Sequence, residues 1–243
     1  MNNEEIEKHI RTYYNLLFDR KIHCDLNIIK GKELAFDLGY SPDLINSIPE
    51  DLWHSFLPCG NPLDNMKPSA NDQILNLGSG VGIDSAALFL SYGSSVRIVN
   101  LDIVYNALKK SKDMMSKYQG IEKSIKWVCA DASRLPFSHS IFDFVIMNGV
   151  FNLFPNKQLL IDEIRRIIKP NGSLIVTDLA CYENLNEDFR NEPDAWAWCM
   201  SGALTKNEIT LLLQSSGFNE ISFNQIEMDN IFYRTIFTCR YFV

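Results

Sequence analysis

The pattern of hydrophobic and polar positions changes at Gln73. From there on, short apolar runs alternate with stretches whose apolar residues recur at helical spacing. The pattern predicts buried strands at 73–77, 95–101, 124–130, 142–148 and 172–179, and helices at 83–92, 104–118 and 157–168. Strands that alternate with helices indicate a parallel sheet covered by helices on both faces. The predicted fold class is therefore α/β.

The two ends of the chain follow other patterns. Apolar residues at helical spacing predict a helix over 4–20, and the prolines that recur from 38 to 70 favour short helices and loops. The C-terminal part predicts a helix at 205–215 and strands at 221–226 and 233–242. We therefore divide the chain into an N-terminal helical and loop extension, 1–70, and an α/β domain, 71–243.

The composition narrows the classes of partner. The 243 residues carry a formal net charge of −7, whereas a nucleic-acid-binding surface needs a clustered excess of Lys and Arg. No apolar run approaches the length that spans a bilayer, and the acidic start "MNNEEIEKHI" is unlike a secretion signal. The six cysteines form no CxxC pair. We expect a reduced, cytoplasmic protein with neither nucleic acid nor membrane as a partner.

A glycine-rich loop, "NLGSGVGID", joins the first strand of this region to its first helix. Gly78, Gly80 and Gly82 permit a tight turn and let a ligand approach the backbone. Asp102 and Asp131 end the second and third strands, where carboxylates can accept hydrogen bonds from a ribose and an adenine edge. Taken singly, each acid is better explained as a helix cap or turn residue. Two acids at successive strand ends beside the loop favour a nucleotide-like ligand.

Five stretches together resemble the class I S-adenosylmethionine-dependent methyltransferases: "ILNLGSGVGID", "VNLD", "ADASRLPF", "FDFVIMNGVFNL" and "IIKPNGSLIV". The resemblance covers about residues 73–180. It implies a Rossmann-like sheet of seven strands, the last one antiparallel and inserted between two others, with S-adenosylmethionine as the cofactor. The cofactor residues that it implies are Gly78, Ser79, Gly80, Gly82, Asp84, Asp102, Ile103, Asp131, Ala132 and Asn148. One departure is Asn76, where the family usually has aspartate.

Two further stretches narrow the resemblance to the arsenite methyltransferases: the segment that ends in "LPCGNP" and "WAWCMSGALTKNEITLLLQSSGF". In that family, thiols at the positions of Cys59 and Cys199 coordinate trivalent arsenic, which suits a soft thiolate. A third family thiol follows the fourth strand, where this chain has Gly149. Two thiolates cannot fill the three sites of pyramidal arsenic. Cys181, just after the fifth strand, stays open as a replacement.

Cysteine is also a common small core residue, and this interpretation stands beside the chemical one. We expect Cys24, Cys129 and Cys239 to be core residues, and we weigh Cys181 the same way. Cys59 and Cys199 sit in loops flanked by Gly, Pro or Trp, which favours a site. The four histidines show no metal-ligand spacing, so no resident metal is expected.

The sequence thus predicts a cytoplasmic S-adenosylmethionine-dependent methyltransferase that acts on a small molecule. Cys59, Cys199 and Asn148 are expected to position the acceptor, with the two cysteines as candidate arsenic ligands. The extension 1–70 and an insertion at 181–204 are expected to form the acceptor lid. Two alternatives stay open: a methyltransferase of an organic metabolite, which Gly149 favours, and a cofactor-binding module without turnover. The oligomeric state is not indicated.

Overall fold

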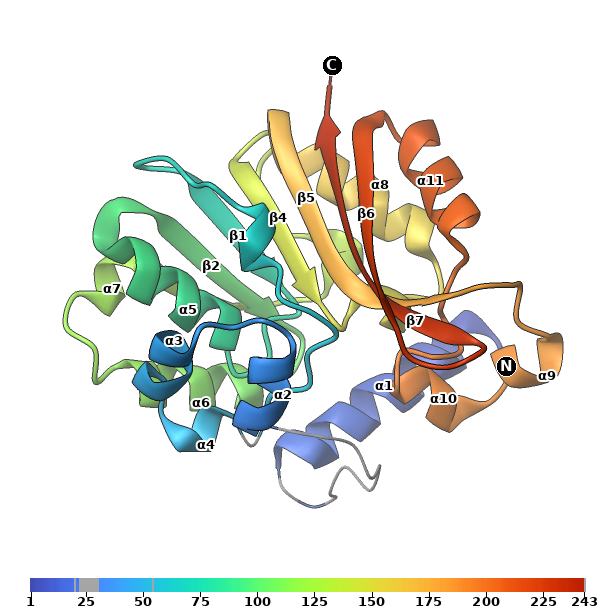
Figure 1. Cartoon of the computed structure of the whole chain (residues 1–243), viewed down its shortest axis with the longest axis horizontal. Helices are drawn as coiled ribbons and strands as arrows, with labels where there is room; N and C mark the ends of the chain where they lie inside the picture. Colours follow the sequence, from blue (N-terminus) through green and yellow to red (C-terminus); the bar gives the residue numbers. More distant parts are fainter. Residues whose placement is uncertain (20, 22–30, 54, 243) are drawn as a thin grey trace.

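A seven-stranded sheet forms the centre of the computed structural model, which describes residues 1–19, 21, 31–53 and 55–242. Its order is β3-β2-β1-β4-β5-β7-β6 (Figure 1). β7 runs antiparallel to both of its neighbours, whereas β1 to β5 pair in parallel, which confirms the predicted sheet. The strands are β1 Gln73–Leu77, β2 Arg97–Asp102, β3 Ile125–Cys129, β4 Phe142–Asn148, β5 Ile168–Cys181, β6 Phe218–Glu227 and β7 Phe232–Tyr241.

Helices cover both faces of this sheet, as the strand pattern requires. Successive strand residues point to opposite faces, so Ile74 belongs to one apolar core and Leu75 to the other. The first core includes α5 and the second includes α8 and α11. The helices are α5 Ile83–Tyr92, α6 Tyr105–Met115, α7 Ile121–Ser124, α8 Lys157–Ile167 and α11 Lys206–Ser215, with short 3₁₀ turns at Gly93–Ser95, Ala132–Arg134 and Phe151–Leu153.

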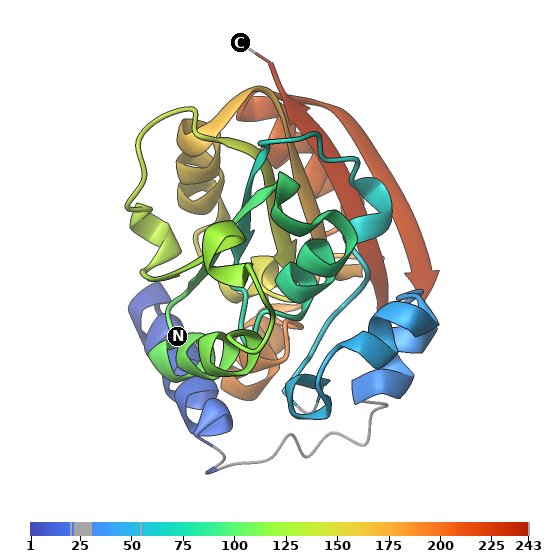
Figure 2. The ribbon, with the colours of Figure 1, turned by 90° about the vertical axis from the view of Figure 1, so that its left-hand side faces the viewer.

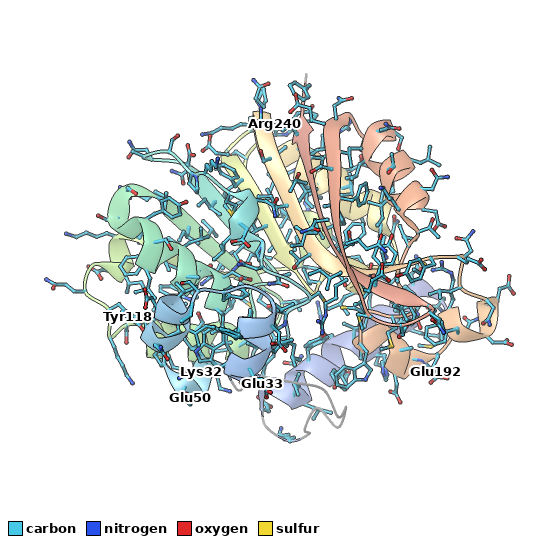
Figure 3. All side chains as sticks on the ribbon, in the orientation of Figure 1. Lys32, Glu33, Glu50, Tyr118, Glu192 and Arg240 are labelled. Atoms are coloured by element: carbon cyan, nitrogen blue, oxygen red, sulfur yellow. The ribbon has the colours of Figure 1, made fainter. Side chains whose placement is uncertain are left out.

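The N-terminal extension begins with the predicted helix, α1 Asn3–Phe18. Short elements follow it: α2 Gly31–Asp37, α3 Pro42–Ser47, α4 Glu50–Trp53 and a 3₁₀ turn at Leu63–Asn65, the last three within the proline-rich region in which short helices were predicted. Leu34, Tyr40 and Trp53 join the same core as α5, so α2 to α4 are anchored to the domain. The hydrogen bond from Tyr118 Oη to the Ser47 carbonyl, at 2.7 Å, adds to this anchoring, and Lys32 pairs with Glu50 at 2.6 Å within the extension itself (Figure 3).

α1 lies across the end of the sheet at which the parallel strands finish (Figures 1 and 2). There it meets α10 Pro193–Ala197, near α9 Glu187–Arg190. Tyr14 Oη donates to the Ala197 carbonyl at 3.0 Å, and His9 Nε2 lies 3.4 Å from Asp194 Oδ1. The start of the chain and the segment 181–204 are therefore in direct contact, although the sequence separates them widely.

Several boundaries differ from the predicted ones, and two of the larger differences have a visible local cause. β5 begins at Ile168 rather than at 172, because Ile168 already pairs with Phe142 and the register shifts before Ser173. The helix predicted over 104–118 ends at Met115, and Gly120 in the left-handed region at φ 83° starts α7. Within the described residues, no helix is long and apolar enough to cross a membrane.

Candidate functional site

A cavity of about 530 Å³ opens where the parallel strands end. The strand order reverses at β1, because its neighbours β2 and β4 lead to opposite halves of the sheet. Open α/β sheets bind their ligands beside such a reversal, and the cavity lies there. α1 provides the facing wall through Tyr14 and Phe18. Nine of the ten predicted cofactor residues line the cavity: Gly78, Ser79, Gly80, Asp84, Asp102, Ile103, Asp131, Ala132 and Asn148.

The glycines of the loop serve different purposes. All three have positive φ, at 71° for Gly78, 52° for Gly80 and 77° for Gly82. A Cβ on Gly78 would lie 2.5 Å from Val150 Cγ2, and one on Gly82 would lie 2.6 Å from Ser111 Oγ. Gly82 faces α6 and does not line the cavity, contrary to the expectation. Only Gly80 leaves open room toward α1.

Asp102 both builds the loop and faces the cavity. Its Oδ2 accepts from the Gly80 N–H and its Oδ1 from the Val104 N–H, each at 2.8 Å. Burial raises the pKa of Asp102, and the backbone hydrogen bonds oppose this rise. A carboxylate oxygen can accept a further hydrogen bond, so ligand hydroxyls still have acceptors here. The structure shows Asp102 as a turn residue and is compatible with its predicted role as a ligand residue.

Asp131 also has a local partner. Its Oδ1 accepts from the Ser133 N–H at 2.9 Å and caps the turn Ala132–Arg134. Its Oδ2 lies 3.5 Å from Arg11 Nη2 of α1, across the cavity mouth. Asp131 thus links the strand-end loops to the helix that covers them.

The cavity suits S-adenosylmethionine, which carries sulfonium and ammonium cations. Its lining contains five carboxylates, Glu4, Glu7, Asp84, Asp102 and Asp131, against the two cations Lys8 and Arg11. Within the described chain, the buried Ser79 Oγ has no hydrogen-bond partner and so is available to a ligand. Asn76 does not contribute, because it is buried with its Nδ2 donating to Ser85 Oγ at 2.9 Å.

The two loop cysteines meet beside Gly149. Cys199 Sγ donates to the Gly149 carbonyl at 3.2 Å, and a Cβ built on Gly149 would lie 3.4 Å from Cys59 Sγ. The structure therefore brings together both predicted thiols and the position of the third family thiol. Neither sulfur lines the cavity itself, whereas their neighbours Leu57 and Gly149 do.

Asp178, three residues before the end of β5, completes this cluster. Cys59 Sγ lies 3.9 Å from Asp178 Oδ1, and the Asn152 N–H and side-chain amide both donate to the carboxylate at 3.0 Å. Burial raises the pKa of Asp178 to about 6. Burial also raises the pKa of both thiols well above the usual range, and the Asp178 carboxylate raises it further. The thiols are therefore protonated at neutral pH.

Sequence reasoning missed Asp178 and its charged neighbour Lys157. Burial lowers the pKa of Lys157 to about 8, and attraction to Asp178 opposes this. Lys157 Nζ lies 5.3 Å from the centre of the Phe151 ring and 5.8 Å from that of Trp196. An acid at the end of an otherwise apolar strand, in "LIVTDLAC", was the available signal. The same signal, an acid toward the carboxyl end of a predicted strand, identified Asp102 and Asp131.

The backbone of Cys199 sets it apart from a packing residue. Its φ of 62° lies in the left-handed region, which costs a side chain roughly 1–3 kcal/mol, and residues strained in this way cluster at active sites and ligand clamps. A small filler at this position would be less strained as glycine. The conformation thus favours the chemical interpretation of Cys199.

The remaining cysteines have other surroundings. Cys239 is buried in the core, as predicted, but Cys129 is exposed at the end of the edge strand β3, so its prediction as a core residue was wrong. Cys181 packs in a separate cluster with Ala203 and Phe232, which rules it out as the third thiol in this conformation. Cys24 lies outside the described residues. Among the residues that the structure describes, no group of three or more His, Cys, Asp or Glu residues could hold a metal ion.

Comparison with known proteins places the chain in a family. The family model described as "Methyltransferase domain" matches residues 68–228, more than half of the chain. An arsenite methyltransferase of Halobacterium salinarum is 26% identical over 186 residues, which are 76% of this chain and 46% of that protein. The human arsenite methyltransferase is 24% identical over 90% of this chain and 59% of its own length. The chain thus spans about half the length of these relatives.

The solved structures agree in fold. An arsenic(III) S-adenosylmethionine methyltransferase from Chlamydomonas reinhardtii superposes with a TM-score of 0.67 at 23% identity, over 84% of this chain and 75% of that one. A phosphoethanolamine N-methyltransferase from Haemonchus contortus in complex with S-adenosyl-L-methionine also reaches 0.67, at 14% identity, over 89% of this chain and 61% of that one. By its family match and its sheet order, the chain belongs to the class I S-adenosylmethionine-dependent methyltransferases and is similar to the arsenite methyltransferases.

Proposed function

We propose that the chain transfers a methyl group from S-adenosylmethionine to a trivalent arsenical held by Cys59 and Cys199. The observation that carries the proposal is the meeting of both thiols with Gly149 at the edge of the cofactor cavity. The left-handed backbone of Cys199 supports it independently. The chain's resemblance to arsenite methyltransferases supplies the class of acceptor.

Different residues of the cavity would contact different parts of the cofactor. Asp102 would accept from the ribose hydroxyls, Asp131 and Ala132 would face adenine, and Gly80 would leave room for the methionine part. When bound, S-adenosylmethionine supplies a methyl group that its sulfonium already activates. The chain's own residues then have to align the acceptor and keep water out.

The two thiols favour an arsenical that already carries one organic group. Each S–H displaces one hydroxyl of arsenic, the S–As bond forms as the As–O bond breaks, and the proton leaves with the hydroxyl as water. Neutral thiols can therefore react, despite their raised pKa. Methylarsonous acid has two hydroxyls and would be fully bound, whereas arsenous acid would keep one. We expect the monomethyl compound to be the better acceptor.

α1 and the segment 181–204 would act as the lid over this acceptor. Their contacts combine an exposed hydrogen bond, from the N-terminal amine to Asn191 Oδ1 at 2.7 Å, with a part-buried one from Tyr14 to Ala197 and an edge-to-face contact of Tyr13 with Trp198. An exposed polar contact of the first kind costs little to break when ligands exchange. The free thiols of Cys59 and Cys199 fit a reducing compartment such as the cytoplasm.

A second candidate is a methyltransferase of an organic metabolite. Gly149 favours it, since the family's third thiol is missing, and so does the position of both sulfurs outside the cavity lining. In that case Cys59 and Cys199 would be packing residues of the lid.

Mass spectrometry of the intact protein with methylarsonous acid separates the two. We expect one methylarsenic group per parent chain, none on Cys59→Ser or Cys199→Ser, and an unchanged amount on the control Cys181→Ser. If both serine variants are still labelled, or if the parent is not labelled at all, the arsenical proposal fails and the metabolite candidate remains. Calorimetry with S-adenosylmethionine tests the cofactor part separately.

A further inference from the structure

The side-chain amide of Asn148 is hydrogen-bonded on both ends. Its Oδ1 accepts from the Cys59 N–H at 2.9 Å and from Thr177 Oγ1 at 2.5 Å. Its Nδ2 donates to the Gly60 carbonyl at 3.0 Å and to Asp84 Oδ2 at 3.1 Å. An amide combines an acceptor with two donors, so this one group binds the backbone on both sides of the Cys59–Gly60 peptide.

Asp84 and Tyr40 extend the network behind Asn148. Tyr40 Oη donates to Asp84 Oδ1 at 2.5 Å, and both residues are almost fully buried, with exposed fractions of 2% for Tyr40 and 4% for Asp84. Both oxygens of Asp84 therefore already have a donor from the protein. These hydrogen bonds explain why Asp84 lines the cofactor cavity and yet points at the N-terminal extension. Tyr40 itself is fixed edge-on against Trp53 and Phe56.

Three separate parts of the chain meet in this network: the extension, the helix that follows the glycine loop, and the end of β4. Gly60 is also held from the other side, because a Cβ there would lie 3.0 Å from Thr177 Cβ. The position of Cys59 relative to the cofactor loop thus depends on buried, directional hydrogen bonds. In-line methyl transfer tolerates little error, since a shift of about 1 Å can slow a reaction on the order of 100-fold.

The geometry points to Asn148, backed by Asp84 and Tyr40, as the positioning residue that fixes Cys59 relative to the cofactor cavity. Asp84 then acts through Asn148 and Tyr40 instead of as a direct cofactor ligand. The inference rests on the proposed function insofar as Cys59 holds the acceptor. The network itself can be tested without any acceptor.

Tyr40→Phe is the most informative variant, because Tyr40 lines neither the cavity nor the thiol cluster and the change keeps its ring. We expect methyl transfer to methylarsonous acid to slow about tenfold, with an unchanged dissociation constant for S-adenosylmethionine. Asn148→Ser should slow transfer more strongly. Asp84→Asn, which keeps the size of the side chain, is the alternative if either variant fails to fold. Ser216→Ala, which loses buried hydrogen bonds near the C-terminal end of α11, is the matched control.

Peptide-resolved alkylation by iodoacetamide provides the second readout and needs no acceptor. Loss of the Tyr40 hydroxyl should raise the alkylation rate of Cys59 severalfold, while Cys239 in the core and Cys129 on the surface stay unchanged. If the chain methylates no arsenical, the proposed function fails and this readout alone decides the inference. Unchanged alkylation of Cys59 in both Tyr40→Phe and Asn148→Ser would overturn it. If the parent does methylate the arsenical, transfer rates of Tyr40→Phe and Asn148→Ser equal to that of Ser216→Ala would overturn it as well.

Discussion

Gly149 shows how one residue limits the chemistry of the site. Its φ is 67°, and a Cβ would come within 3.0 Å of the Leu57 carbonyl and 3.4 Å of Cys59 Sγ. A thiol at this position would reach Cys59, but it would be strained by roughly 1–3 kcal/mol. Comparing two substitutions at position 149 separates the effect of an added thiol on arsenite binding from the effect of backbone strain on stability.

Gly149→Cys should bind arsenite at least about tenfold more tightly than Gly149→Ala, because the third thiol is held near the other two. Both variants carry the same Cβ and the same backbone strain, so they should be equally destabilised. Arsenite titrations followed by calorimetry and thermal unfolding measure the two effects. Equal arsenite affinities would mean that position 149 does not face the acceptor.

Asp102 is expected to contribute most to cofactor affinity. Losing its charge-assisted hydrogen bonds costs roughly 2–4 kcal/mol, or about 30- to 1000-fold in affinity. Calorimetry should show this loss for Asp102→Ala. The control Asp143→Ala removes a carboxylate that also accepts a backbone N–H, from Gln73 at 2.9 Å, outside the cavity. An equal loss in both variants would trace the effect to general destabilisation.

At the residue scale, the sequence indicated groups with a local signature. Asp102 and Asp131 could be found because each ends a strand beside the glycine loop. Tyr40 and Asn152 could not, because their roles depend on partners 44 and 26 residues away along the chain. The family resemblance assigned Gly82 to the cofactor, but the direction in which Gly82 faces depends on the packing of α6.

The loop between β1 and α5 is the element on which cofactor binding depends. Gly80→Val would place a branched side chain at φ 52° in the space between the loop and Phe18, so S-adenosylmethionine should no longer bind. Gly93→Val is the matched control, with φ 58° and nothing within 4 Å of its Cβ. Calorimetry should show binding only for the control. Tight binding by Gly80→Val would place the cofactor elsewhere.

Most elements were predictable because period-2 and period-3.6 patterns are local. The place of α1 was not, because it follows from contacts such as Tyr14 with Ala197 and Arg11 with Asp131. The apolar spacing of α1 indicated a helix but could not indicate which surface it covers. That surface is the mouth of the cavity.

The whole molecule carries buried acids that should make its stability depend on pH. Burial raises the pKa of Asp84 in the folded protein to about 6, above the ordinary value of 3.8 that applies to the unfolded chain. The folded protein therefore binds more protons than the unfolded one in this range, so the free energy of unfolding falls as pH rises from about 4 to about 6. For Asp84 the fall is on the order of 2 kcal/mol.

Urea unfolding at several pH values measures this fall. Asp84→Asn cannot ionise, so its stability should change less with pH than that of the parent. Asp178, which also has a pKa raised to about 6, retains part of the slope. A constant stability difference between parent and variant across pH 4–6 would contradict the shifted pKa of Asp84.

The arrangement of the whole molecule brings Cys59 from the extension and Cys199 from the segment 181–204 to the end of β4. The resemblance to arsenite methyltransferases anticipated this meeting, whereas hydrophobic patterning gave no sign of it. The patterning also could not show that Asp178 of β5 would lie between them.

Single-turnover transfer of a labelled methyl group from S-adenosylmethionine tests the central claim most directly. The acceptors are methylarsonous acid and arsenite, and the proteins are the parent, Cys59→Ser and Cys199→Ser. We predict that the parent methylates methylarsonous acid faster than arsenite and that either serine substitution abolishes the transfer. Fast methylation of arsenite by the parent, unaffected by either substitution, would contradict the two-thiol site.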